Sequence, residues 1–317
     1  MRGAFFRALA KLAERDERVF LAVGDLGFGV AEDFARRFPE RFLNAGVAEQ
    51  NLTGIAAGLA LSGKIVFTYS IANFPILRCL EQVRSDVCYH RANVKIVCVG
   101  GGFAYGSLGP SHHATEDLAI MRALPQMTVL APGDPQEAEA ATRAIAEHAG
   151  PCYLRLVRAG EPKVHRAQID FRLGRAIQVC EGNDLTLIST GGMLETGVRV
   201  AERLHDQGLQ ARLLSMHTLK PLDENAVRQA ARETGAVFTL EEHSVIGGLG
   251  SAVAEVLAES GEAAVTFKRF GLPSSFACVA GTQEYLRAHY GLSPQAVGNA
   301  IASQLTEGRI LSVAAGS

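Results

Sequence analysis

A few residues in this chain have the types and positions needed for proton chemistry in a shared pocket. Glu49 is a lone carboxylate that precedes a segment of small and apolar residues, 52–62. A glycine-rich stretch, residues 100–113, ends in His112 and His113. A carboxyl and two imidazoles can donate and accept protons. Whether they act together depends on the strands and helices that position them.

Short apolar runs alternate with segments of helical periodicity along the chain. Strands are predicted over residues 19–23, 65–69, 94–99, 128–130, 152–156, 185–189, 211–215, 236–240 and 265–270. Helices are predicted over residues 3–15, 48–60, 75–89, 115–123, 135–147, 195–207, 224–233 and 249–258. This alternation predicts an α/β fold made of two open, mainly parallel sheets with helices on both faces.

A break in the pattern divides the chain into two domains. Between residues 156 and 183 the periodicity is lost, and glycine, proline and charged residues become frequent. We therefore expect a first domain over residues 1–160, a linker over 161–183 and a second domain over 184–317.

The candidate residues follow the predicted strands of the first domain. Ligands of open parallel sheets bind beyond the carboxyl ends of the strands. Asp25 follows the first strand and Phe74 the second, whereas Arg158 follows the last strand of this half. A glutamate at a helix start often only caps the helix, and a loop histidine is often only solvated. Together, however, these residues describe a pocket edge with an acid, an aromatic ring, histidines and cations.

Composition and missing motifs exclude several classes of protein. The formal net charge is -2, which gives no field that would attract nucleic acid or an anionic membrane. The sequence contains no GxGxxG motif after the first strand, no P-loop, no HExxH and no GxSxG. Six cysteines without a CxxC pair indicate reduced thiols, and we expect a cytoplasmic protein without a membrane segment.

Four motifs resemble those of the transketolase family. They are the stretches 44–51 (NAGVAEQN), 54–60 (GIAAGLA), 109–117 (GPSHHATED) and 241–250 (EEHSVIGGLG). The resemblance covers nearly the whole chain and is strongest to the C-terminal subunit of a split transketolase. It implies pyrimidine-binding and C-terminal domains, thiamine diphosphate as the cofactor and transfer of a two-carbon unit.

The resemblance also implies roles for individual residues. Glu49 matches the glutamate that donates a hydrogen bond to the cofactor's pyrimidine ring and thereby activates it. His112 matches a histidine directed at the reacting carbon and the donor hydroxyls. The remaining candidates are Phe74, Ile71 and Asp25 around the cofactor, and His113, Leu108, Arg158 and Arg2 around the substrate, where the two arginines fall near its phosphate.

Two departures from the family pattern concern the donor. Ser107 and Leu108 stand where the family carries acidic residues, and the glycines at 100–102 replace a stretch that carries a histidine. A sugar hydroxyl buried against Leu108 would lose a hydrogen bond, at a cost of about 1–3 kcal/mol. A less hydroxylated donor such as pyruvate would fit this pattern better than a ketose phosphate.

The family's GDG motif, which holds the magnesium ion, is missing from this sequence. The Mg2+ ligands should therefore come from a separate diphosphate-binding subunit, most simply in an α2β2 complex. Two alternatives remain at this point. One is the β subunit of a 2-oxoacid dehydrogenase-like E1 component, and the other is a non-catalytic scaffold partner.

Overall fold

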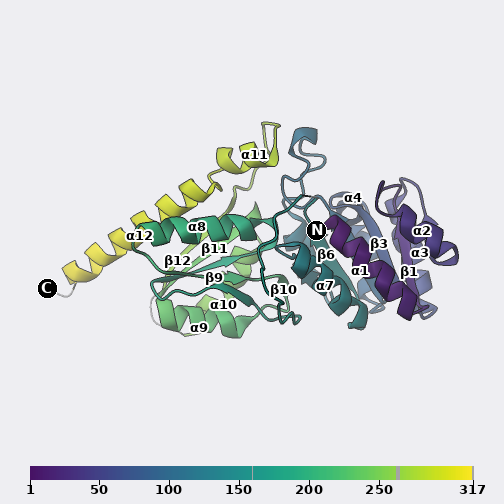
Figure 1. Cartoon of the computed structure of the whole chain (residues 1–317), viewed down its shortest axis with the longest axis horizontal. Coiled ribbons are helices and arrows are strands. Elements are labelled where there is room, and N and C mark those ends of the chain that lie inside the picture. The colour runs from purple at the N-terminus through teal and green to yellow at the C-terminus, as the bar shows by residue number, and fades with distance from the viewer. Residues whose placement is uncertain (159, 262–264, 316–317) are drawn as a thin grey trace.

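The computed structural model describes residues 1–158, 160–261 and 265–315, which form two sheets side by side (Figure 1). Both sheets are covered by helices on both faces, so the predicted α/β class is confirmed. The last helix, α12 (Pro294–Ala315), extends away from the second sheet at the far end of the molecule (Figure 1). In the described part of the chain, no helix is both long and apolar enough to cross a membrane.

The first sheet has seven strands in the order β10-β5-β6-β4-β3-β1-β2. All neighbouring strands are parallel except β10, which runs antiparallel to β5. The strands are β1 (Val19–Val23), β2 (Phe42–Asn44), β3 (Ile65–Ile71), β4 (Val94–Val99), β5 (Thr128–Leu130), β6 (Cys152–Leu156) and β10 (Thr218–Lys220). Because the central strands are buried on both faces, they are continuous apolar runs rather than alternating ones.

Two sets of helices cover this sheet. On one face α1 (Arg2–Arg15) and α7 (Pro135–Glu147) pack together, and Phe5 of α1 contacts the rings of Phe67 and Tyr69 from β3. The other face is covered by α3 (Glu49–Leu61), whose Ala56 belongs to the same core cluster as Val66 of β3. Neighbouring residues of β3 therefore face opposite helix layers, as the period of a strand requires.

The second sheet has five strands in the order β12-β11-β8-β9-β7, of which only β7 is antiparallel. The strands are β7 (Ile177–Cys180), β8 (Leu185–Ser189), β9 (Ala211–Ser215), β11 (Ala236–Ser244) and β12 (Thr266–Leu272). On one face lie α8 (Leu194–Asp206) and α12. Helices α9 (Glu224–Thr234) and α10 (Leu249–Glu259) lie on the other, where their core is continuous with that of the first sheet.

Several elements differ from those expected from the sequence. The expected linker supplies β7 to the second sheet, and the second half supplies β10 to the first sheet. The expected helix 75–89 is divided into α4 (Phe74–Leu77), α5 (Leu80–Gln82) and a π-helical segment, Val83–Cys88. Helix α6 (Asp117–Ala123) begins after Glu116, without a side-chain cap from Thr115. The elements α2 (Glu32–Arg37), β2, α11 (Gln283–His289) and α12 were not predicted.

Buried charges join the two halves. Arg155 of β6 is 3% exposed, and its Nε donates to the Asp117 carboxylate at 2.8 Å. Its Nη2 donates to the backbone carbonyl of Ala114 at 2.7 Å and to that of Glu242 at 3.0 Å. The Glu242 carboxylate in turn accepts from Arg287 of α11 at 2.8 Å. Breaking such a buried pair leaves an uncompensated charge, at a cost of about 3–5 kcal/mol, so this network fixes the glycine-rich stretch between the halves.

Candidate active site

Glu49 is the first residue of α3 and is 3% exposed. Its Oε2 accepts a hydrogen bond from Arg78 Nη1 at 3.0 Å. Its Oε1 is buried and has no hydrogen-bond partner among the described residues. The carboxyl therefore does not cap its own helix, and one of its oxygens is left for a group that this chain does not supply.

A continuous row of side chains leads from Glu49 to Arg158. The guanidinium of Arg78 lies over the Phe74 ring, with Cζ 4.2 Å from the ring centroid. The centroids of Phe74 and His112 are 5.3 Å apart, and those of His112 and Tyr105 are 6.4 Å apart. The Cζ atom of Arg158 lies 5.5 Å from the Tyr105 ring centroid. The fold thus brings together four residues expected from the sequence: Glu49, Phe74, His112 and Arg158.

His112 is half-buried at the centre of this row, and its Nδ1 lies 3.0 Å from the Ser111 hydroxyl. Burial lowers the pKa of its imidazole, and the charges of His113 and Arg78 lower that pKa further. The ring is therefore neutral at pH 7. A neutral imidazole can accept a proton from a reacting group or share one with it.

Two arginines lie at the other end of the row. The Arg2 amide donates to the Arg158 carbonyl at 3.2 Å, and Arg2 Nε is buried without a hydrogen-bond partner in the described structure. The Arg158 side chain is exposed and stacks on Tyr105. Two guanidinium groups at one end of the row are suited to an anionic group such as a phosphate.

The remaining expected residues lie around this row. Asp25 is exposed and bonds to the Asn44 side chain at 3.0 Å, just before the loop that leads to Glu49. Ile71 is buried at the end of β3. The buried His113 ring packs against Phe103 and its Nε2 lies 3.2 Å from the Gly106 carbonyl oxygen, so it supports the glycine-rich stretch. Leu108 is 54% exposed, so in this chain it buries no donor hydroxyl.

The glycines at 100–102 have a packing reason that their sequence did not reveal. A Cβ atom on Gly101 would lie 2.7 Å from Arg155 Nε, and one on Gly102 would lie 2.6 Å from the Glu242 carboxylate. Gly100 and Gly102 also have positive φ values of 98° and 63°. Gly101 and Gly102 therefore have no room for a side chain beside Arg155 and Glu242, whereas a Cβ atom on Gly100 would lie 2.5 Å from the Tyr105 ring.

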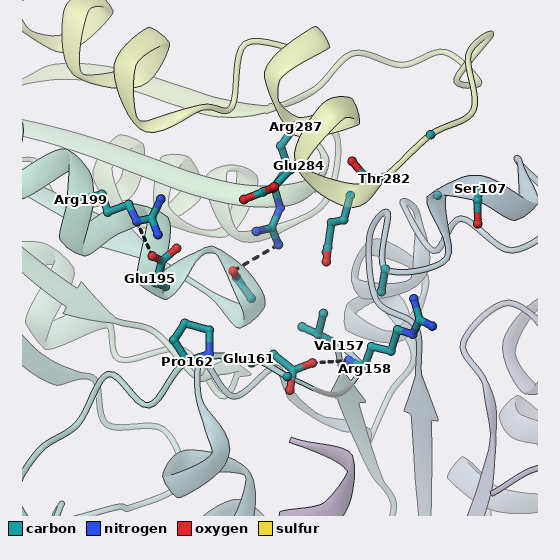
Figure 2. A pocket seen from close by; sticks show the side chains of 17 residues that line it. Ser107, Val157, Arg158, Glu161, Pro162, Glu195, Arg199, Thr282, Glu284 and Arg287 are labelled. Atoms are coloured by element: carbon teal, nitrogen blue, oxygen red, sulfur yellow. Dashed lines mark hydrogen bonds and ion pairs between the residues drawn. The ribbon is translucent and has the colours of Figure 1, made fainter. Parts of the chain in front are cut away.

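A cavity of about 450 Å³ lies between the two halves, behind the glycine-rich stretch (Figure 2). Two of the three glutamates that line it are engaged: Glu195 pairs with Arg199, and Glu161 accepts from the Arg158 amide at 2.6 Å. The Arg158 side chain extends away from Glu161 (Figure 2). Arg158 thus lines this cavity and also belongs to the row, where its guanidinium lies over the Tyr105 ring.

Sequence reasoning missed two members of the row, Arg78 and Tyr105. Arg78 is four residues after Phe74, which puts the two side chains on one side of a helical turn. That spacing was a usable signal for Arg78. Tyr105 lies in irregular structure, where no periodicity indicates the direction of a side chain. Among the described residues, no group of three or more histidine, cysteine, aspartate or glutamate side chains could hold a metal ion.

Two protein families match the chain. The family described as "Transketolase, pyrimidine binding domain" matches residues 1–161, and "Transketolase, C-terminal domain" matches residues 174–297. The first match contains the whole row from Glu49 to Arg158.

Individual relatives are similar over nearly their whole length. The chain is 39% identical to one subunit of the apulose-4-phosphate transketolase of Phocaeicola vulgatus, covering 93% of this chain and 94% of that protein. It is also 39% identical to the 6-deoxy-6-sulfo-D-fructose transketolase subunit SqwH of Clostridium sp., covering 97% and 94%. A solved structure described as a split gene transketolase, inactive beta4 tetramer, has a TM-score of 0.87 and 42% identity, covering 96% and 97%.

The glycine-rich stretch generates the first testable prediction. Replacing Gly102 with alanine should destabilise the protein, because the new Cβ meets the Glu242 carboxylate and the φ of 63° is unfavourable. We expect a loss of about 1–2 kcal/mol from the left-handed backbone and about 1–3 kcal/mol from overpacking. Urea denaturation measures this loss.

Gly63→Ala is the matched control, because Gly63 also has a positive φ, 93°, but a Cβ atom at this position would have no heavy atom within 4 Å. Equal losses for the two variants would contradict the packing explanation.

Proposed function

The chain belongs to the transketolase family, and we propose that it is the pyrimidine-binding subunit of a two-chain transketolase that moves a two-carbon unit from a donor to an aldehyde acceptor. The observation that carries this proposal is the buried Glu49 carboxyl, which has one oxygen without a partner beside an aromatic ring and a neutral imidazole. Such a carboxyl fits the ring nitrogen of an aminopyrimidine.

We assign thiamine diphosphate as the cofactor, which supplies a carbon nucleophile that carries the two-carbon unit. Glu49 Oε1 is placed to donate a hydrogen bond to the pyrimidine ring, for which the carboxyl must carry a proton. Phe74 offers an aromatic face for that ring, and Ile71 closes the site at the end of β3. Asp25 fixes Asn44 at the entrance of the loop that leads to Glu49.

We assign substrate binding to the other half of the row. His112, whose imidazole is neutral at pH 7, exchanges a proton with the donor's oxygen. Arg158 and Arg2 hold a phosphate, while His113 supports the stretch that carries His112. We keep pyruvate as the donor to be tested against a ketose phosphate, while the exposed Leu108 buries no donor hydroxyl and so gives pyruvate no support.

We further propose that a separate diphosphate-binding subunit holds the Mg2+ ion, in an α2β2 complex in the cytoplasm. The absence of a GDG motif from this sequence supports this division. An exposed side of α3 also supports this assembly, because that side has no neighbour within the described part of this chain. On it, Cβ atoms at Gly54 and Gly58 would have no heavy atom within 4 Å, and Val47 and Leu61 are 71% and 62% exposed.

The first test of the function is Glu49→Gln in the complex with the diphosphate-binding subunit. Turnover should fall by about 10²–10⁴ because glutamine cannot exchange the proton. Two-carbon transfer is measured with thiamine diphosphate and Mg2+, with pyruvate and a ketose phosphate as alternative donors. The unfolding temperature should stay close to that of the wild type.

Near wild-type turnover of this variant would refute the role of Glu49. Strong preference of the wild-type complex for the ketose phosphate would refute the pyruvate assignment alone. Turnover by the purified chain without the second subunit would refute the division of the site.

The pH profile tests His112. Because the pKa of His112 lies below the ordinary value, the ring binds a proton only at a lower pH, and activity that requires the neutral ring persists below pH ~6.5. We expect the acidic limb of kcat/KM to lie below that pH and to disappear in His112→Gln. If the acidic limb of kcat/KM is unchanged in His112→Gln, that limb belongs to a group other than His112.

The exposed side of α3 generates a prediction about assembly. Gly54→Leu should leave the free chain as stable as the wild type or up to about 1 kcal/mol more stable, because glycine is unfavourable inside a helix. The same change should weaken the complex, since leucine fills the space that another chain would occupy. Analytical ultracentrifugation with the second subunit measures this effect.

Asn225→Leu on the exposed side of α9 is the control, because it adds a similar apolar side chain far from α3. If Gly54→Leu assembles with the second subunit as the wild type does, the contact between the two subunits does not lie on this side of α3.

A further inference from the structure

The Glu49 carboxyl is held by one cation of its own chain. The two atoms of the ion pair, Arg78 Nη1 and Glu49 Oε2, are 3.0 Å apart, and the side chains differ sharply in exposure, at 50% for Arg78 and 3% for Glu49. A buried carboxylate without a partner would cost several kcal/mol. Arg78 therefore stabilises the charged form of Glu49 in the chain on its own.

The same guanidinium also contacts the aromatic ring beside Glu49. Its Cζ lies 4.2 Å from the Phe74 ring centroid. The backbone carbonyl of Arg78 accepts a hydrogen bond from the Gln50 side chain at 2.9 Å, which keeps this residue at the start of α3. One half-exposed side chain thus engages both groups that we assign to the pyrimidine ring.

The other groups near the carboxyl are not charged partners. The Thr53 hydroxyl donates to the backbone carbonyl of Glu49, not to its carboxyl. Burial raises the pKa of the Cys79 thiol, and the nearby Glu49 charge raises it further, so this thiol is neutral. Among the described residues, Arg78 is the cation that contacts the Glu49 carboxyl.

The ion pair with Arg78 and the proposed hydrogen bond to the ring require different forms of the Glu49 carboxyl. A carboxyl that donates a hydrogen bond to a ring nitrogen must carry a proton, whereas a guanidinium at 3.0 Å favours the form without a proton. We propose that Arg78 is an internal counter-ion that competes with the cofactor's pyrimidine ring for Glu49, and that it releases the carboxyl when the ring binds. This inference rests on the function proposed above.

Two consequences follow for binding of the cofactor. In the wild type, the Arg78 pair must break and Glu49 must take up a proton. When residue 78 has no charge, the buried carboxyl lacks the cation that favours its charged form, and no ion pair has to break before the ring binds. Removal of the Arg78 charge should therefore tighten binding and reduce the uptake of protons.

The test is Arg78→Met in the complex with the diphosphate-binding subunit. Isothermal titration with thiamine diphosphate and Mg2+, in two buffers of different ionisation enthalpy, measures the affinity and the number of protons taken up. We expect binding about ten-fold tighter or more, and about one proton fewer than in the wild type. Free Arg78→Met chain should unfold at a lower temperature than the wild type.

Three further variants make the result specific. Arg84→Met removes an exposed arginine from the neighbouring π-helical segment and should bind the cofactor like the wild type. Arg78→Lys keeps the charge and should retain the wild-type proton uptake. In a Glu49→Gln background, Arg78→Met should no longer tighten binding, because the two changes act through one pair.

Weaker or unchanged binding by Arg78→Met, or unchanged proton uptake, would overturn the inference while leaving the proposed function intact. Failure of the wild-type complex to bind thiamine diphosphate would instead overturn the proposed function itself. If Arg78→Met does not fold, Arg78→Gln takes its place: we expect the same tighter binding and the same reduced proton uptake, and the absence of either overturns the inference.

Discussion

The buried guanidinium of Arg155 is the interaction on which the rest of the structure depends. It binds the Asp117 carboxylate and two backbone carbonyls, those of Ala114 and Glu242, and so joins β6, α6 and β11. Gly101 and Gly102 pass directly beside the Arg155 guanidinium and the Glu242 carboxylate, where a Cβ atom would lie 2.7 Å and 2.6 Å from these groups. The positions of Tyr105 and His112, further along the same stretch, follow from this constraint, because the stretch is fixed at both ends.

The site that results has the side chains that we propose for one half of an active site. It offers a buried acid, an aromatic ring, a neutral imidazole and two guanidinium groups, in that order along one row. What the row lacks is a set of oxygen ligands for a divalent cation, which a diphosphate cofactor would need. This division explains why one side of α3 can remain exposed and apolar on the single chain: the carboxyl that starts this helix would complete its function next to another polypeptide.

The two halves of the chain are separated more clearly in the sequence than in the structure, where elements of the second half pack into the first. The loss of periodicity after residue 156 coincides with the end of β6 at Leu156. Strand β10 nevertheless returns to that sheet, and the cores of the two sheets are continuous through α9 and α10. A three-residue antiparallel edge strand has too few residues to produce a periodic signal, so it could not be found without the structure. The same length argument applies to β2, a parallel edge strand of three residues, and helices α11 and α12 were also overlooked.

The sequence by itself determined the alternation of strands and helices, the burial of Glu49 and the family to which the chain belongs, because each of these is encoded in short runs of neighbouring residues. The tertiary structure alone decided which side chains meet. Glu49 and Arg78 are 29 residues apart, and Gly102 and Glu242 are brought together from opposite halves of the chain. Such contacts depend on the order and register of strands in a sheet, which local patterns do not specify. For that reason the burial of Glu49 could be predicted from the sequence, but its ion pair with Arg78 could not.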